Sequence, residues 1–149
     1  MPRTTPPAAL ILGGAGLIPF LGLSALVILG HSPFGLAPRP LLAAYGAVIA
    51  SFLGGLRWGA AAASPDGRGA DYVVSVVPSL IAWAALFAPA PWDLRALGAL
   101  VLAWGLVDQD LPRRGLVPAW LGRLRLVLSG VAGLALLAAG FLENSLISG

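Results

Sequence analysis

The stretch Ser51-Phe-Leu-Gly-Gly-Leu-Arg57-Trp-Gly59 places one arginine and three glycines inside a segment that is otherwise apolar from Leu41 to Ala63. This segment is long enough to cross a bilayer, because about 20 helical residues span a hydrocarbon core of about 30 Å. An unpaired guanidinium inside the membrane costs at least about 2.5 kcal/mol. The sequence therefore predicts a transmembrane helix in which the interface, a carboxylate or a bound anion compensates the charge of Arg57.

The composition is typical of a membrane protein. Hydrophobic residues make up 58% of the 149 residues and charged residues only 10%, whereas roughly a quarter of an ordinary soluble domain is charged. A soluble protein of this composition would expose unusually large apolar patches. The net charge of +3 comes from arginines beside apolar segments, which is typical of membrane topology and does not indicate nucleic-acid binding.

Few residues of the chain could carry out chemistry. It has no cysteine, and its one histidine, His31, lies in a polar turn, so thiolate metal sites and cysteine nucleophiles are excluded. The sequence contains no phosphate-binding loop, nucleophile elbow or His-Glu-x-x-His motif. We therefore expect no metal site and no cofactor, and we expect that the protein is not an enzyme.

Five apolar segments divide the chain, which we interpret as a single integral membrane domain over residues 1–149. Pro19 and Pro78 lie within the first and third segments and should kink them, because proline donates no backbone hydrogen bond. The fourth segment is short, so it either lies where the bilayer is thin or is buried against its neighbours. The fold class predicted is all-α, a polytopic membrane bundle of about five transmembrane helices, over residues 8–29, 41–63, 72–89, 94–108 and 124–142.

The distribution of arginines predicts the orientation. If the N-terminus is cytoplasmic, only Arg39 and Arg95 lie on the outer side, and Arg57 lies inside the membrane. Cytoplasmic loops are enriched in basic residues, so we predict an N-in, C-out topology. The inner side then carries Arg3, Arg68, Arg113, Arg114, Arg123 and Arg125.

Small residues recur along the second segment in two ridges. One ridge includes Ser51, Gly55 and Gly59, and the other includes Gly46 and Gly54. Such ridges let helix backbones approach closely in lipid. Packing within this one chain is the favoured interpretation and a homodimer face is the alternative, and in both cases the helix is expected to be central.

Arg57 has several candidate partners. It lies six residues before Ala63, about 9 Å from that helix end, so its side chain could reach the interface. Asp108 ends the fourth segment on the same predicted side, and a bidentate Arg57–Asp108 pair would satisfy both charges. Contact with an anion, a substrate or another subunit is the alternative.

The most polar part of the chain runs from residue 108 to residue 125. Its arginines flank an apolar stretch that contains Trp120, a pattern that fits a segment at the level of the lipid headgroups. A plain loop that sets the topology is the simpler alternative. The candidate contacts to anionic lipids or to a partner are Arg113, Arg114, Trp120, Arg123 and Arg125.

Four stretches of the chain resemble an uncharacterised family of membrane proteins. They are residues 16–20, 45–59, 75–83 and 116–125, and in this order and spacing they resemble domain-of-unknown-function family 3429 over about residues 8–142. The resemblance implies a small multi-helix protein of the bacterial inner membrane, or of the mitochondrial inner membrane in eukaryotic relatives. It implies no catalytic residue, since the family has no established activity.

These patterns favour a non-enzymatic accessory or assembly subunit of the inner membrane. The small-residue ridges would contact other membrane proteins or a second copy of the chain, and Arg57 and the 108–125 segment would contact a partner or the lipid bilayer. The alternative is a small transporter or channel component in which Arg57 contacts an anion.

Overall fold

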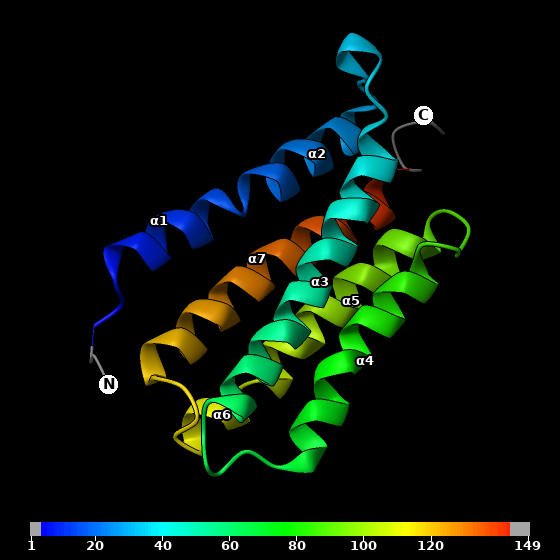
Figure 1. Ribbon diagram of the computed structural model, residues 1–149. Coiled ribbons are helices and arrows are strands. Elements are labelled where there is room, and N and C mark those ends of the chain that lie inside the picture. Colours follow the sequence, from blue (N-terminus) through cyan, green and yellow to red (C-terminus); the bar gives the residue numbers. More distant parts are fainter. Residues whose placement is uncertain (1–3, 144–149) are drawn as a thin grey trace.

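The computed structural model describes residues 4–143, and within them the protein is helical, without strands (Figure 1). The predicted all-α fold is confirmed. The helices are α1 (Pro7–Ala15), α2 (Ile18–Leu29), the short 3-10 helix η1 (Pro33–Gly35), α3 (Pro38–Ala62), α4 (Gly69–Ala85), α5 (Trp92–Val107), α6 (Asp110–Arg113) and α7 (Ala119–Leu142).

Three segments of the described chain are long and apolar enough to cross a membrane. They are the α1–α2 segment of 23 residues, α3 of 25 residues and α7 of 24 residues. Helices α4 and α5 are shorter, with 17 and 16 residues, or about 26 and 24 Å at 1.5 Å per residue. Figure 1 shows these five rods side by side, with consecutive rods running in opposite directions.

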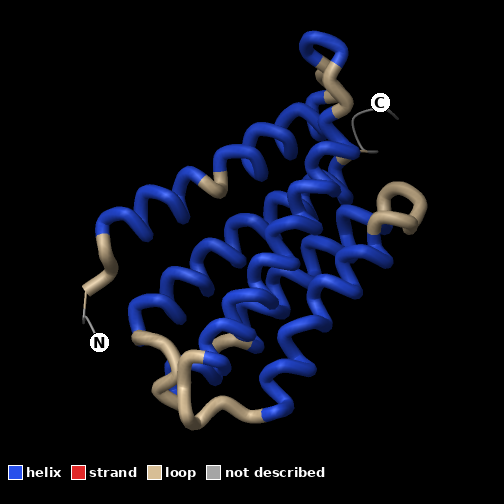
Figure 2. Tube along the Cα trace, viewed as in Figure 1, coloured by secondary structure: helices blue, strands red, loops and turns tan. Residues whose placement is uncertain are grey.

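The first rod is broken, at a place the sequence marks. Helix α1 ends at Ala15, and α2 begins at Ile18, so that Pro19 falls in its first turn, where the missing N–H of proline costs no helical hydrogen bond. Figure 2 shows the break as a short non-helical link. Within the described chain, α1 has no buried residue and is therefore held less firmly than α2. By contrast, Pro78 is buried inside α4, and the helix continues through it from Gly69 to Ala85.

Helix α5 is the most enclosed of the rods. It contacts α3, α4 and α7, and its Leu94, Leu97 and Val101 are fully buried. Gly98 of α5 faces Gly133 of α7 so closely that a Cβ on Gly98 would lie 2.9 Å from the Gly133 carbonyl oxygen. Helix α3 contacts α2, α4 and α5, but one of its faces stays exposed, so the central position expected for it is shared with α5.

The helix bounds differ from the predicted ones by a few residues, most clearly at α7. This helix begins at Ala119, whereas the sequence predicted a start near residue 124. Arg123 interrupts the apolar pattern, so the predicted helix begins after it. Pro118, which precedes the helix in extended conformation, is the residue that sets its start.

The turns gather the charged residues at two ends of the bundle. The first end, here called the α6 end, holds the C-termini of α3 and α5, the N-termini of α4 and α7, and α6 itself (Figure 1). Arg39, Asp93, Arg95 and Glu143 lie at the opposite end. The predicted N-in, C-out topology assumes this same grouping of charges. The orientation itself stays a prediction. Arg3 lies outside the described residues.

Candidate functional site: a buried arginine–aspartate cluster

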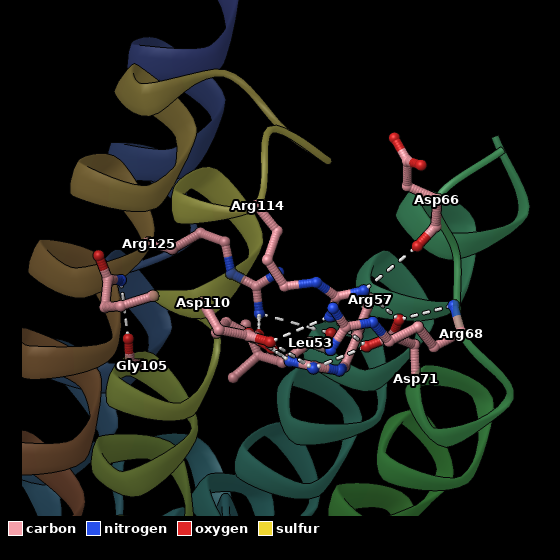
Figure 3. Close-up of polar contacts among 11 residues, drawn as sticks. Leu53, Arg57, Asp66, Arg68, Asp71, Gly105, Asp110, Arg114 and Arg125 are labelled. Carbon is pink, nitrogen blue, oxygen red and sulfur yellow. Dashed lines mark hydrogen bonds and ion pairs between the residues drawn. The ribbon is translucent and has the colours of Figure 1, made fainter. Parts of the chain in front are cut away.

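A cluster of three arginines and three aspartates joins four helices and the loop region at the α6 end (Figure 3). Helix α3 contributes one arginine, α4 one aspartate, and the segment from the end of α5 to α7 the other four residues. We call this group the ion cluster. Its members are Arg57, Asp71, Asp108, Asp110, Arg114 and Arg125.

Arg57 is the hub of the ion cluster. Its Nη1 and Nη2 donate to the two carboxylate oxygens of Asp110 at 2.9 and 3.0 Å. Nη1 also donates to Asp108 at 3.0 Å, and Nη2 donates to Asp71 at 2.9 Å. The hypothesised Arg57–Asp108 contact is therefore present, but as a single hydrogen bond, and the fork-shaped pairing is made with Asp110.

Arg114 and Asp71 form a bidentate pair beside this hub. The two terminal guanidinium nitrogens of Arg114 each lie 2.8 Å from an oxygen of Asp71. Asp71 also accepts a hydrogen bond from the backbone N–H of Arg68 at 3.0 Å, and it lies in the first turn of α4, where the helix dipole favours a negative charge. One carboxylate thus fixes the start of α4 and ties it to two arginines.

Arg125 and Asp108 form the third, most enclosed part of the cluster. Nη2 of Arg125 donates to Asp108 and, at 3.4 Å, to the backbone carbonyl oxygen of Leu53 in α3. The side chain of Asp108 is fully buried and that of Arg125 is 6% exposed. Helices α5, α7 and α3 are therefore joined by charge as well as by packing.

The ion cluster is electrically neutral when all six groups are ionised, since its three positive and three negative charges cancel. Neutrality matters because an isolated charge at membrane depth is costly. Among the described residues, no group of His, Cys, Asp or Glu is placed to hold a metal ion. The arrangement binds helices together, and each carboxylate already accepts from a guanidinium.

A second, smaller network lies at the opposite end of the bundle. Arg39 pairs with Asp93 through two hydrogen bonds of 2.7 and 2.6 Å and with Glu143 through one of 2.9 Å. Arg95 donates to the Gly140 carbonyl oxygen at 2.9 Å and lies over the ring of Phe141. These side chains are more exposed than the core of the ion cluster, so each contact there is worth less.

Acidification is expected to remove the stability that Asp110 provides. Burial acts to raise the pKa of Asp110, but the hydrogen bonds and charges of Arg57 and Arg114 outweigh it and hold the pKa below its usual value. A carboxylate with a lowered folded pKa stabilises the fold above about pH 4, its unfolded pKa, and loses this contribution as the pH falls through the folded pKa. The temperature midpoint of unfolding should therefore decrease as the pH is lowered below about 4. This decrease should be smaller in Asp110→Asn than in the wild type. Identical pH profiles for the two proteins would contradict this assignment.

The two small-residue ridges of α3 have different surroundings. A Cβ on Gly54 would lie 2.1 Å from the Ser75 carbonyl oxygen of α4, and one on Gly46 would lie 3.4 Å from Leu136 of α7, so this ridge packs within the chain. The expectation of internal packing is wrong for the other ridge. Ser51, Gly55 and Gly59 are exposed, and apart from the adjoining part of α3 no described atom comes within 4 Å of a Cβ on either glycine.

The 108–125 segment also differs from its predicted role. Arg114 and Arg125 were expected to contact lipid or a partner, but they lie in the ion cluster, because Asp71 and Asp108 are brought within hydrogen-bonding distance of them. Arg113 and Arg123 are exposed, as such a contact requires, and Trp120 is half-buried.

Sequence reasoning missed Asp71 and Asp110 as partners of Arg57. One pattern in the sequence could have identified Asp71. The turn Ser64-Pro-Asp-Gly67 predicts a helix hairpin, and a hairpin brings the last turns of one helix next to the first turn of the next. No comparable pattern marks Asp110, since its position depends on the short helix α6.

Comparison with known proteins places this bundle in a family. The family model described as "Protein of unknown function (DUF3429)" matches residues 5–141. The chain belongs to the DUF3429 family.

Two curated relatives carry the same name. This DUF3429 chain is 37% identical over 153 residues to transmembrane protein 69 of Xenopus tropicalis, a match that covers 96% of the chain and 56% of the relative. It is 32% identical over 148 residues to transmembrane protein 69 of Mus musculus, a match that covers 94% of the chain and 58% of the relative. The chain thus spans somewhat more than half the length of these relatives. No solved structure matches it significantly.

Proposed function

We propose that this membrane protein is a non-enzymatic accessory or assembly subunit that binds another membrane protein through the exposed ridge of α3. The observation that carries the proposal is that, apart from the adjoining part of α3 itself, no described atom comes within 4 Å of a Cβ on Gly55 or Gly59. Small residues on a lipid-facing helix let a second helix approach closely, and packing of this kind drives association in membranes.

The surface beside the ridge supports the same proposal. A cavity of about 400 Å³ opens between α3 and α4 and is lined in part by Ser51, Ser79 and Trp83. Trp83 is 64% exposed and stacks edge-to-face with Phe87 at 5.1 Å between ring centroids. Tryptophan is enriched among the residues that contribute most to the binding energy of protein interfaces.

The alternative, transport of an anion at Arg57, has less support. Both terminal nitrogens of Arg57 donate to carboxylates, so an incoming anion would have to displace an aspartate. The inner-membrane location belongs to the proposal, as does the N-in, C-out orientation, which rests on the arginine distribution.

Native mass spectrometry of the tagged chain, extracted mildly from its own membranes, tests the accessory role. We expect a larger complex of fixed stoichiometry in the wild type. In Gly55→Leu/Gly59→Leu the complex should decrease about tenfold, which corresponds to about 1.4 kcal/mol, while the amount of folded chain stays the same.

Gly22→Leu is the matched control for this experiment. Gly22 is an exposed helical glycine of α2, and no described residue comes within 4 Å of its Cβ position, so the complex should persist in this variant. A wild-type chain that is extracted alone, or a complex that survives the double substitution unchanged, would exclude the proposed interface.

A further inference from the structure

Two adjoining cavities lie between the N-terminal rod and the rest of the bundle. Their volumes are about 300 and 160 Å³. The larger one reaches Arg125 of α7, and the smaller one continues to Ala132. Both are walled by α1, α3 and α7, and the lining residues they share are Leu12, Gly13, Phe52, Leu53, Leu128 and Ser129.

The lining of the larger cavity contains a charged residue with unused hydrogen-bond donors. Arg125 is 5% exposed, and its Nε and Nη1 have no hydrogen-bond partner among the described residues, although Nη2 donates to Asp108 and to Leu53. Buried polar groups in proteins nearly always have partners. Both atoms are enclosed by neighbouring side chains, so an acceptor that enters from the cavity would complete this guanidinium after a small shift of these side chains.

We propose that these cavities bind one acyl chain of a membrane glycerophospholipid, with an ester carbonyl oxygen accepting hydrogen bonds from Arg125. Apart from Arg125 and Ser129, the described residues of the walls are apolar, which suits a hydrocarbon chain. This site does not rest on the proposed accessory role, although Phe52, which lines both cavities, is also exposed on α3.

Charge balance selects a carbonyl over an anionic group. Asp108 already neutralises Arg125, and the ion cluster as a whole carries equal numbers of positive and negative charges. A phosphate or a free carboxylate placed at Arg125 would add an uncompensated negative charge beside the fully buried Asp108. A neutral carbonyl oxygen satisfies the donors without that penalty.

The length and depth of the cavities fit one leaflet of a bilayer. Arg125 lies six residues after the start of α7 at Ala119, or about 9 Å along the helix axis. The lining on α7 extends from Leu121 to Ala132, which is about 16 Å, and about 10 Å of this lies beyond Arg125 toward the membrane centre, within the half-thickness of a 30 Å hydrocarbon core. Because α1 has no buried residue within the described chain, a lipid can reach the cavities without disturbing the core.

Lipid retention measured by native mass spectrometry tests the proposal. The full chain is delipidated in mild detergent and incubated with diester phosphatidylcholine, with its diether analogue of the same chain length, or with diester phosphatidylglycerol. We expect both diester lipids to bind equally well, and the diether lipid about tenfold more weakly, because it lacks the carbonyl acceptors.

Two pairs of variants locate the binding. Ala9→Phe fills the larger cavity from α1 and should reduce retention of the diester lipids about tenfold, whereas Ala8→Phe, at an exposed neighbour outside the lining, should not. Arg125→Lys keeps a positive charge for Asp108 but removes the unused donors, and it should weaken diester binding to the level of the diether lipid. Arg68→Lys, at an exposed arginine outside the linings of both cavities, is its control.

Three outcomes would overturn the proposal. Equal retention of the diester and diether lipids would exclude recognition of the carbonyl. Retention of phosphatidylglycerol alone would assign binding to the charged headgroup. Equal retention in Ala9→Phe and Ala8→Phe would place the lipid outside the cavities, and this comparison remains decisive if Arg125→Lys does not fold.

Discussion

Replacing Arg57 with leucine is expected to destabilise the protein by about 3–5 kcal/mol, the usual cost of removing one partner from a buried ion pair. Arg57 is 4% exposed and donates to three aspartates, so its loss leaves three carboxylates with two arginines. The measurement is the free energy of unfolding in mild detergent, together with the amount of chain in the membrane.

A charge-balanced double variant separates this effect from simple loss of packing. In Arg57→Leu/Asp110→Leu, the remaining groups form two complete pairs, Arg114 with Asp71 and Arg125 with Asp108. We therefore expect the double variant to be more stable than Arg57→Leu alone, a non-additive result of the kind found for residues in contact. Arg39→Leu, at the more exposed opposite network, should cost less. If Asp108→Asn were as stable as the wild type while Arg57→Leu did not fold, the pairing of Arg57 with Asp108 would be contradicted.

Gly54→Ala is expected to destabilise the bundle by about 2–3 kcal/mol, because the added methyl group has no space. Its Cβ would lie 2.1 Å from the Ser75 carbonyl oxygen and 2.9 Å from Pro78, both in α4. Since the first of these atoms belongs to the backbone, relief requires that α3 and α4 move apart. The same measurement of unfolding detects this change.

Gly55→Ala, one residue away, is not expected to destabilise the protein. Its Cβ would meet no described residue within 4 Å, and alanine is favoured over glycine in a helix by up to about 1 kcal/mol. We expect this variant to be as stable as the wild type or slightly more stable. Equal effects of the two substitutions would mean that α3 and α4 do not approach each other as closely as the structure places them.

Hydropathy predicted the helical architecture well, because an apolar run of membrane length has few alternatives to a helix. The number of rods and the break near Pro19 follow from the sequence. The start of α7 does not, since Arg123 interrupts the apolar pattern and the predicted helix therefore begins after it. Pro118 sets the start of the helix, and the charge of Arg125 within it is compensated by Asp108 at the end of α5.

The ion cluster could be predicted only in part, because it also depends on contacts between residues that are far apart in the sequence. The sequence identified Arg57 as a charge that requires a partner. It identified Asp108 as a candidate because the ends of the two helices were expected on the same side of the membrane. Asp110 and Arg114 depend on the path of the chain through α6 and the left-handed Gly115, which no local pattern specifies. The exposure of Gly55 and Gly59 depends on the way α3 is rotated against α4, which the spacing of small residues leaves open.

The ion cluster also has a consequence for biosynthesis, in which helices enter the membrane in order. Helices α3 and α4 carry Arg57 and Asp71, one charge of each sign, and these two residues bind each other at 2.9 Å. The later part, from Asp108 to Arg125, carries two aspartates and two arginines of the cluster. Each half of the cluster is therefore neutral by itself. The α3–α4 hairpin is translated before the part from Asp108 to Arg125. It can therefore leave the insertion machinery before the other charged residues of the cluster have been translated.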